Sequence, residues 1–133
     1  MASSYAPSVK DSSGYLTGGA VTTLRATLAY TDTTAKALFT IPAGAYITAW
    51  VINVTTAFND SGTDLVDIGV SGTQQKFAAS VDVSSTGLKS SGVVAAQIGA
   101  VQASAQAVTG LYTGQNSNAS TGAATIMVQF YIP

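Results

Sequence analysis

The chain has 133 residues, a length that suits one domain with a single hydrophobic core. Only 8% of its residues are charged, its formal net charge is −1, and it contains no Cys and no His. This composition excludes disulfide frameworks, thiolate or imidazole metal sites, and catalysis by a thiol or an imidazole. It also provides no basic surface for a phosphate backbone, so we expect no nucleic-acid partner.

The cationic residues are scattered singly, without interleaved aromatic residues, which is typical of solvated surface charges: Lys10, Arg25, Lys36, Lys76 and Lys89. Residues 1–4 lack a basic segment followed by an apolar one, so we expect no secretory signal and synthesis in the cytoplasm. The longest bulky apolar stretch, residues 46–52, is far shorter than the ~20 residues that cross a bilayer. We therefore expect no membrane association.

Residues 1–20 mix Ser, Gly and Pro with isolated aromatic residues and show no strand or helix period. Two interpretations remain open: a frayed terminus, or an extended arm that becomes ordered on a neighbouring subunit. In the second interpretation Tyr5, Tyr15 and Leu16 anchor the arm. The predicted organisation is an arm over residues 1–20 followed by one domain over residues 21–133.

Abundant Thr, Val, Ser and Gly, together with the absence of Glu, favour strands joined by turns in that domain. Alternation predicts a half-buried strand over residues 23–30, and a second strand follows over residues 36–41. The strongest strand spans residues 46–55, and we expect both of its faces to be covered. One predicted face contains Ile47, Ala49 and Val51, and the other contains Tyr46, Trp50, Ile52 and Val54.

The second half of the domain continues this pattern of short strands and polar turns. Further strands are predicted over 65–71, 77–83, 107–113 and 124–132, with polar loops over 59–63, 84–92 and 114–118. Residues 93–108 fit a broken helical stripe, but Gly99 and the lack of a cap favour strand or irregular chain. Seven or eight such strands predict an all-β, single-domain antiparallel β-sandwich that is jelly-roll-like.

Three acidic residues, Asp60, Asp64 and Asp67, lie close together in the sequence. Neighbouring carboxylates can act as acid and base, or they can bind calcium. The segment NDSGTD lacks the ligand alternation and the closing Glu of an EF-hand, and its residues are those that turns use. We therefore expect a turn here, with no metal site and no cofactor, and leave calcium binding as the alternative.

No sequence motif indicates catalysis. Ser and Thr are abundant, but neither GxSxG nor SxxK occurs, and a hydroxyl nucleophile needs a neighbouring base. We expect no catalytic residues and no small-molecule substrate, so the protein is not an enzyme. A different possibility is a sugar-binding platform of aromatic side chains, formed by Tyr30, Tyr46, Trp50 and Tyr112; the alternative for Trp50 and Tyr46 is a place in or beside the core.

The run from Phe39 to Val83 contains FTIPAG, TTAFNDSGTD and LVDIGVSG, and it ends within FAASVDVSSTG, which continues to Gly87. This run resembles small β-sandwich virion proteins of tailed bacteriophages, of the capsid cement (head decoration) type. The resemblance implies a protein that is made in the host cytoplasm and binds the outer capsid surface. Its expected partners are the major capsid protein and two further copies of itself, as a homotrimer. Some relatives are fibre or tail components, and a carbohydrate- or host-receptor-binding module remains the alternative function.

Overall fold

The computed structural model describes residues 21–133, which form eight strands and one short 3₁₀ turn, η1. The elements are β1 (Thr22–Ala29), β2 (Lys36–Ile41), β3 (Tyr46–Thr56), β4 (Asp64–Val70), β5 (Thr73–Asp82), β6 (Gly87–Lys89), η1 (Ala95–Gln97), β7 (Gln106–Gly114) and β8 (Ala123–Tyr131). Within this part of the chain, no helix is long and apolar enough to cross a membrane. The arm predicted over residues 1–20 lies outside the described residues.

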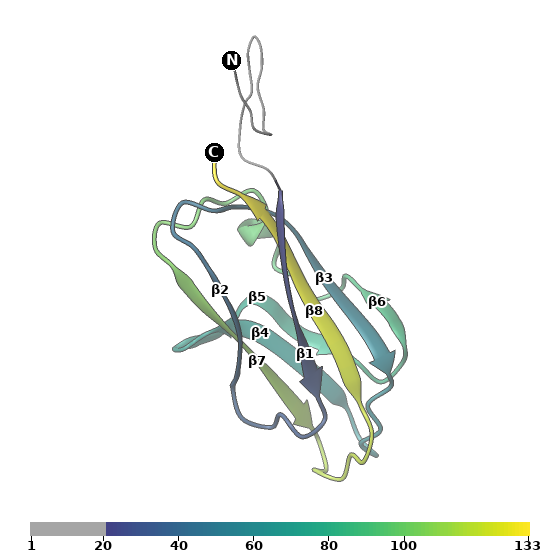
Figure 1. Ribbon diagram of the computed structural model, residues 1–133. Helices are drawn as coiled ribbons and strands as arrows, with labels where there is room; N and C mark the ends of the chain where they lie inside the picture. The colour runs from purple at the N-terminus through teal and green to yellow at the C-terminus, as the bar shows by residue number, and fades with distance from the viewer. Residues whose placement is uncertain (1–20) are drawn as a thin grey trace.

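The strands form two four-stranded sheets that pack face to face (Figure 1). Their orders are β1-β8-β3-β6 and β2-β7-β4-β5, and all neighbouring strands are antiparallel. The pairs β1·β8, β2·β7, β3·β6 and β4·β5 are nested, as in one long hairpin folded over into two layers. This arrangement is an eight-stranded jelly roll, so the predicted antiparallel β-sandwich is confirmed.

Alternating side chains of both sheets fill the space between them. On β8 the buried residues are Ala124, Ile126, Val128 and Phe130, as its sequence pattern predicts. The indole of Trp50 lies in the core between two phenyl rings, with its centroid 6.1 Å from that of Phe39 and 4.9 Å from that of Phe77. The core therefore joins β2, β3 and β5 through aromatic contacts as well as aliphatic ones.

The predicted assignment of the two faces of β3 is wrong at the start of the strand. The ladder between β3 and β8 shifts register between Ile47 and Ala49, where β3 contains one extra residue. Such a bulge reverses which residues face inward. Ile47 is therefore fully buried on the same face as Trp50, whereas Ala49 and Val51 are only half-buried on the outer face.

Two other segments differ from the sequence-based expectation. β5 begins at Thr73, four residues before the predicted start, and β6 occupies part of the predicted loop over residues 84–92. In the ambiguous segment, irregular chain is confirmed, with the single turn η1 and isolated bridges at Val93 and Val101. Two backbone hydrogen bonds hold this segment beside β3: the Gly99 N–H donates to the Ile47 carbonyl, and the Ile47 N–H donates to the Ala100 carbonyl.

Candidate functional site

A polar network joins the β3–β4 loop to the β7–β8 loop at the end of the sandwich opposite the C-terminus (Figure 1). Its centre is Asp60, which is buried. The carboxylate accepts backbone N–H bonds from Gly62 at 2.7 Å, from Asn116 at 3.0 Å and from Asn118 at 3.0 Å. One side chain of the first loop therefore fixes the backbone of the second loop.

Asp64 connects this network to the core. Its Oδ1 accepts the Tyr112 hydroxyl at 2.6 Å and the Asp60 backbone N–H at 3.0 Å, and both Asp64 and Tyr112 are buried. The Tyr112 ring packs on Phe58, with centroids 4.8 Å apart. Burial raises the pKa of Tyr112 above its ordinary value of 10.0, and the hydrogen bond to Asp64 raises it further.

The Asp60 carboxylate stabilises the backbone of the two loops in its ionised form. Burial alone raises its pKa, but the N–H bonds from Asn118, Gly62 and Asn116 outweigh burial and lower the pKa below 3.8. The ionised oxygens thus already accept bonds from the two loops. The segment NDSGTD bends the chain between β3 and β4, as the turn interpretation predicts.

Asp67 does not join Asp60 and Asp64. It lies on β4, opposite the bulge in β5. There its Oδ1 accepts the Ser80 backbone N–H at 2.7 Å and the Gln75 side-chain amide at 3.0 Å. Over residues 21–133, no group of three or more acidic side chains is placed to hold a metal ion. Of the three carboxylates that cluster in the sequence, only Asp60 and Asp64 thus lie together.

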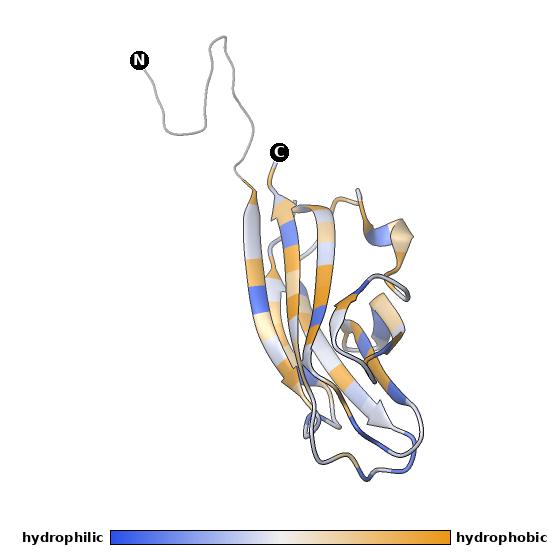
Figure 2. Ribbon diagram, turned by 90° about the vertical axis from the view of Figure 1, so that its right-hand side faces the viewer, coloured by the Kyte–Doolittle hydropathy of each residue, from blue (hydrophilic) through white to orange (hydrophobic). Residues whose placement is uncertain are grey.

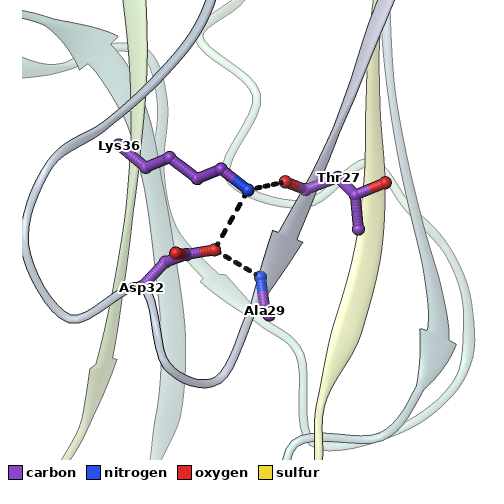
Figure 3. A network of polar contacts seen from close by, with 4 residues as sticks. All are labelled: Thr27, Ala29, Asp32 and Lys36. Carbon is purple, nitrogen blue, oxygen red and sulfur yellow. Dashed lines mark hydrogen bonds and ion pairs between the residues drawn. The ribbon is translucent and has the colours of Figure 1, made fainter.

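A groove of about 490 Å³ lies beside this network, between the β1–β2 connection and the β7–β8 loop. It is lined by Tyr30, Thr31, Thr33, Tyr112, Thr113, Gly114, Ser117 and Ala119. The β1–β2 connection that forms one wall is held by Asp32, which accepts the Ala29 N–H at 2.7 Å and pairs with Lys36 at 3.5 Å (Figure 3). Lys36 also donates to the Thr27 carbonyl at 2.7 Å.

The four aromatic residues considered as a sugar platform do not gather on one surface. Trp50 and Tyr112 are buried in the core, and Tyr30 lines the groove. Tyr46 lies on the outer face of the sheet β1-β8-β3-β6, beside Tyr131, with ring centroids 5.0 Å apart. For Trp50, the structure therefore agrees with the alternative to the sugar platform, a place in the core.

The outer face of the sheet β1-β8-β3-β6 carries few charges. Figure 2 shows β1, β8 and β3 as banded strands, in which apolar or neutral bands alternate with single hydrophilic ones, and shows hydrophilic segments in the loops at the lower end. Ladder register assigns these outward residues: Thr23, Arg25, Thr27, Tyr46, Ala49, Val51, Asn53, Leu88, Thr125, Met127, Gln129 and Tyr131. Among them only Arg25 is charged, and it lies on the edge strand β1.

The fold defines the class of protein: an eight-stranded jelly roll whose loops are locked at one end. No family model matches the chain, and no curated protein sequence matches it. Two solved structures share the fold. One is a chain of the cyanophage Pam1 capsid asymmetric unit, with a TM-score of 0.65 and 18% identity over 96% of this chain and 100% of that chain.

The other is a chain of the acid-stable capsid structure of Helicobacter pylori bacteriophage KHP30. Its TM-score is 0.66, with 14% identity over 88% of this chain and 91% of that chain. Identities this low establish a common fold. The likeness extends over nearly the whole length of each chain.

Proposed function

We propose that this protein is a non-enzymatic structural component of a bacteriophage virion. In this proposal it binds the outer surface of the capsid as a cement protein, contacts the major capsid protein and acts as a homotrimer. The observation that carries the proposal is the fold match over almost the full length of two chains from phage capsid structures. The resemblance of the segment from Phe39 to Val83 to phage cement proteins supports the same role.

The surface of the sandwich suits a contact between neutral protein surfaces. The chain has 8% charged residues, and two of its acids, Asp60 and Asp64, are buried in the loop network. Contacts with a capsid must therefore depend mainly on backbone edges and on small apolar or hydroxyl side chains. Several weak contacts per trimer sum to strong retention, because each bound copy raises the effective concentration of the others.

The test is binding to bare mature capsids of the phage that encodes the protein, measured by co-sedimentation at low and high ionic strength. We expect saturable binding that changes little with salt, because few charges are available to be screened. We also expect the bound protein to raise the temperature at which capsids disrupt. Absence of co-sedimentation at both ionic strengths contradicts the proposal.

The groove favours a second candidate function, a host-receptor module of a tail or fibre. Its wall combines the Tyr30 ring with the hydroxyls of Thr31, Thr33 and Ser117, which is the type of lining that binds sugars. A glycan-binding assay with the wild type and Thr33→Val separates the two candidates. Glycan binding that Thr33→Val abolishes, combined with no binding to capsids, supports the receptor module.

A further inference from the structure

β1 lies at one edge of its sheet and is the most regular of the four edge strands. Its ladder with β8 runs from Thr22 to Ala29 without a register shift, and its sequence, TTLRATLA, contains no proline. The outward backbone of such a strand is a template on which a strand of another chain can pair. Proteins prevent this pairing with bulges, prolines, very short edge strands or charged side chains.

The other three edge strands are each irregular. β6 has only three residues. β2 shifts register between Ala37 and Phe39 and is followed by Pro42. The ladder of β5 shifts register twice, and part of its outer edge is covered by the bond from the Ala79 N–H to the Gly92 carbonyl. β1 is therefore the edge strand that depends on some other protection.

The directions of the β1 backbone groups follow from the end of its ladder. The Tyr30 N–H donates to the carbonyl of Gly122, the residue before β8, at 3.1 Å. Successive residues of a strand direct their N–H and C=O groups to opposite sides, so those of Ala29 and of every second residue before it point away from β8. Within residues 21–133, two of these outward residues, Thr27 and Ala29, have hydrogen-bond partners for their outward groups.

Asp32 and Lys36 provide those partners and cover the C-terminal end of the edge (Figure 3). Asp32 binds both outward groups of Ala29: its carboxylate accepts the N–H at 2.7 Å, and its own N–H donates to the carbonyl at 3.0 Å. The Lys36 ammonium donates to the Thr27 carbonyl at 2.7 Å and lies 3.5 Å from the Asp32 carboxylate. The two residues thus take the places that the backbone of a pairing strand would take.

We propose that Asp32 and Lys36 block the edge of β1 against pairing with β1 of a second copy. Two such edges match, because identical regular strands can pair antiparallel about a twofold axis and satisfy each other's N–H and C=O groups. The block removes three of these groups on each chain, and pairing over it would also desolvate two charges. This role is independent of the proposed capsid function, since it concerns the edge of the isolated chain.

The test is the molar mass in solution, measured by light scattering over a range of concentrations. The variant combines Asp32→Ala with Lys36→Ala. The matched control combines Asp82→Ala with Lys89→Ala, which removes the same charges from residues whose side chains bind Ser84 and Ser85 in a loop. We expect the control to keep the mass of the wild type and the variant to associate at least about tenfold more tightly, because three backbone groups are released for pairing.

Adding Thr27→Pro to the double variant separates edge pairing from unfolding. The Thr27 N–H points away from β8, so a proline at this position keeps the β8 ladder and blocks the edge again. We expect this third substitution to restore the mass of the wild type. Amide hydrogen exchange is the second readout, and the N–H groups of Arg25 and Thr27 should become protected only as the double variant associates.

Lys36→Met tests the edge even if the double variant fails to fold. It releases the Thr27 carbonyl and leaves the bonds between Asp32 and Ala29 in place, so we expect a smaller increase in mass. A wild-type mass for both Lys36→Met and the double variant overturns the edge block. Larger assemblies that form equally in the control, or that Thr27→Pro leaves unchanged, overturn it as well.

Discussion

Asp60 shows how one side chain can determine the conformation of two loops that are far apart in the sequence. Its partner Asn118 is 58 residues away, and the carboxylate accepts the N–H groups of Asn116 and Asn118 in the second loop as well as that of Gly62 in its own loop. The sequence identified Asp60 and Asp64 as notable because acids were clustered there. It could not identify Tyr112 or Asn116 as their partners, because no spacing relates residues that meet only after two sheets have formed.

The ionisation of Asp60 makes stability depend on pH. Its pKa in the folded protein lies below 3.8, the value expected in the unfolded chain. The stabilisation by the carboxylate is therefore complete above that pH and is lost as the pH falls through the folded-state pKa. We expect the melting temperature of the wild type to decrease as the pH falls below about 4.

The variant Asp60→Asn replaces one acceptor oxygen by an amide that opposes the loop N–H groups. We expect a melting temperature lower by several degrees at neutral pH and a shallower decrease on acidification. Thermal melting followed by circular dichroism checks both effects. Asp82→Asn is the comparison, since Asp82 is exposed and solvent weakens its contribution. Identical pH profiles for wild type and Asp60→Asn contradict the role given to this carboxylate.

At the scale of the elements, strict alternation was the reliable signal. It identified the strands β1 and β8, and the polar segments 59–63 and 114–118 correctly marked loops. It failed at bulges, because one extra residue, as beside Ile47 in β3, reverses the faces without any change in composition. It also missed β6, since three residues are too few to show a period.

Gly122 provides a prediction about how two loops fit together. It ends the β7–β8 loop at φ +149°, and a Cβ placed there lies 2.4 Å from Cδ2 of the buried Phe58 ring. We expect Gly122→Ala to lower the free energy of unfolding by about 3 kcal/mol, through overpacking and backbone strain. Urea denaturation measures this change.

Gly44→Ala is the matched control for that experiment. Gly44 also has a positive φ, +85°, but a Cβ there meets no atom within 4 Å. We expect this control to cost only about 1 kcal/mol, the cost of the left-handed backbone alone. Equal destabilisation by the two substitutions contradicts a contact between Gly122 and Phe58.

At the scale of the whole molecule, the buried core residues of the described part of the chain, residues 21–133, all lie between Leu28 and Phe130. Residues 1–20 show no strand period in the sequence, so we expect a protein that lacks them to keep its sandwich and its melting temperature. The proposed arm acts between subunits, so we expect the same deletion to weaken oligomer formation and capsid binding. Melting curves and capsid co-sedimentation of the truncated protein measure the two effects. Unfolding of the truncated domain contradicts an arm and indicates a core segment.

The nested strand pairs also determine the order in which the strands can pair as the chain is synthesised. β1 has β8 as its ladder partner in the sheet, and about ninety residues separate the two strands. At a synthesis rate of about 5–20 residues per second, β1 waits roughly 5–20 s on the ribosome before β8 exists. Only the innermost hairpin, β4 and β5, can pair as soon as it is made. The sandwich therefore closes from its middle outward and is completed only once β8 has been made.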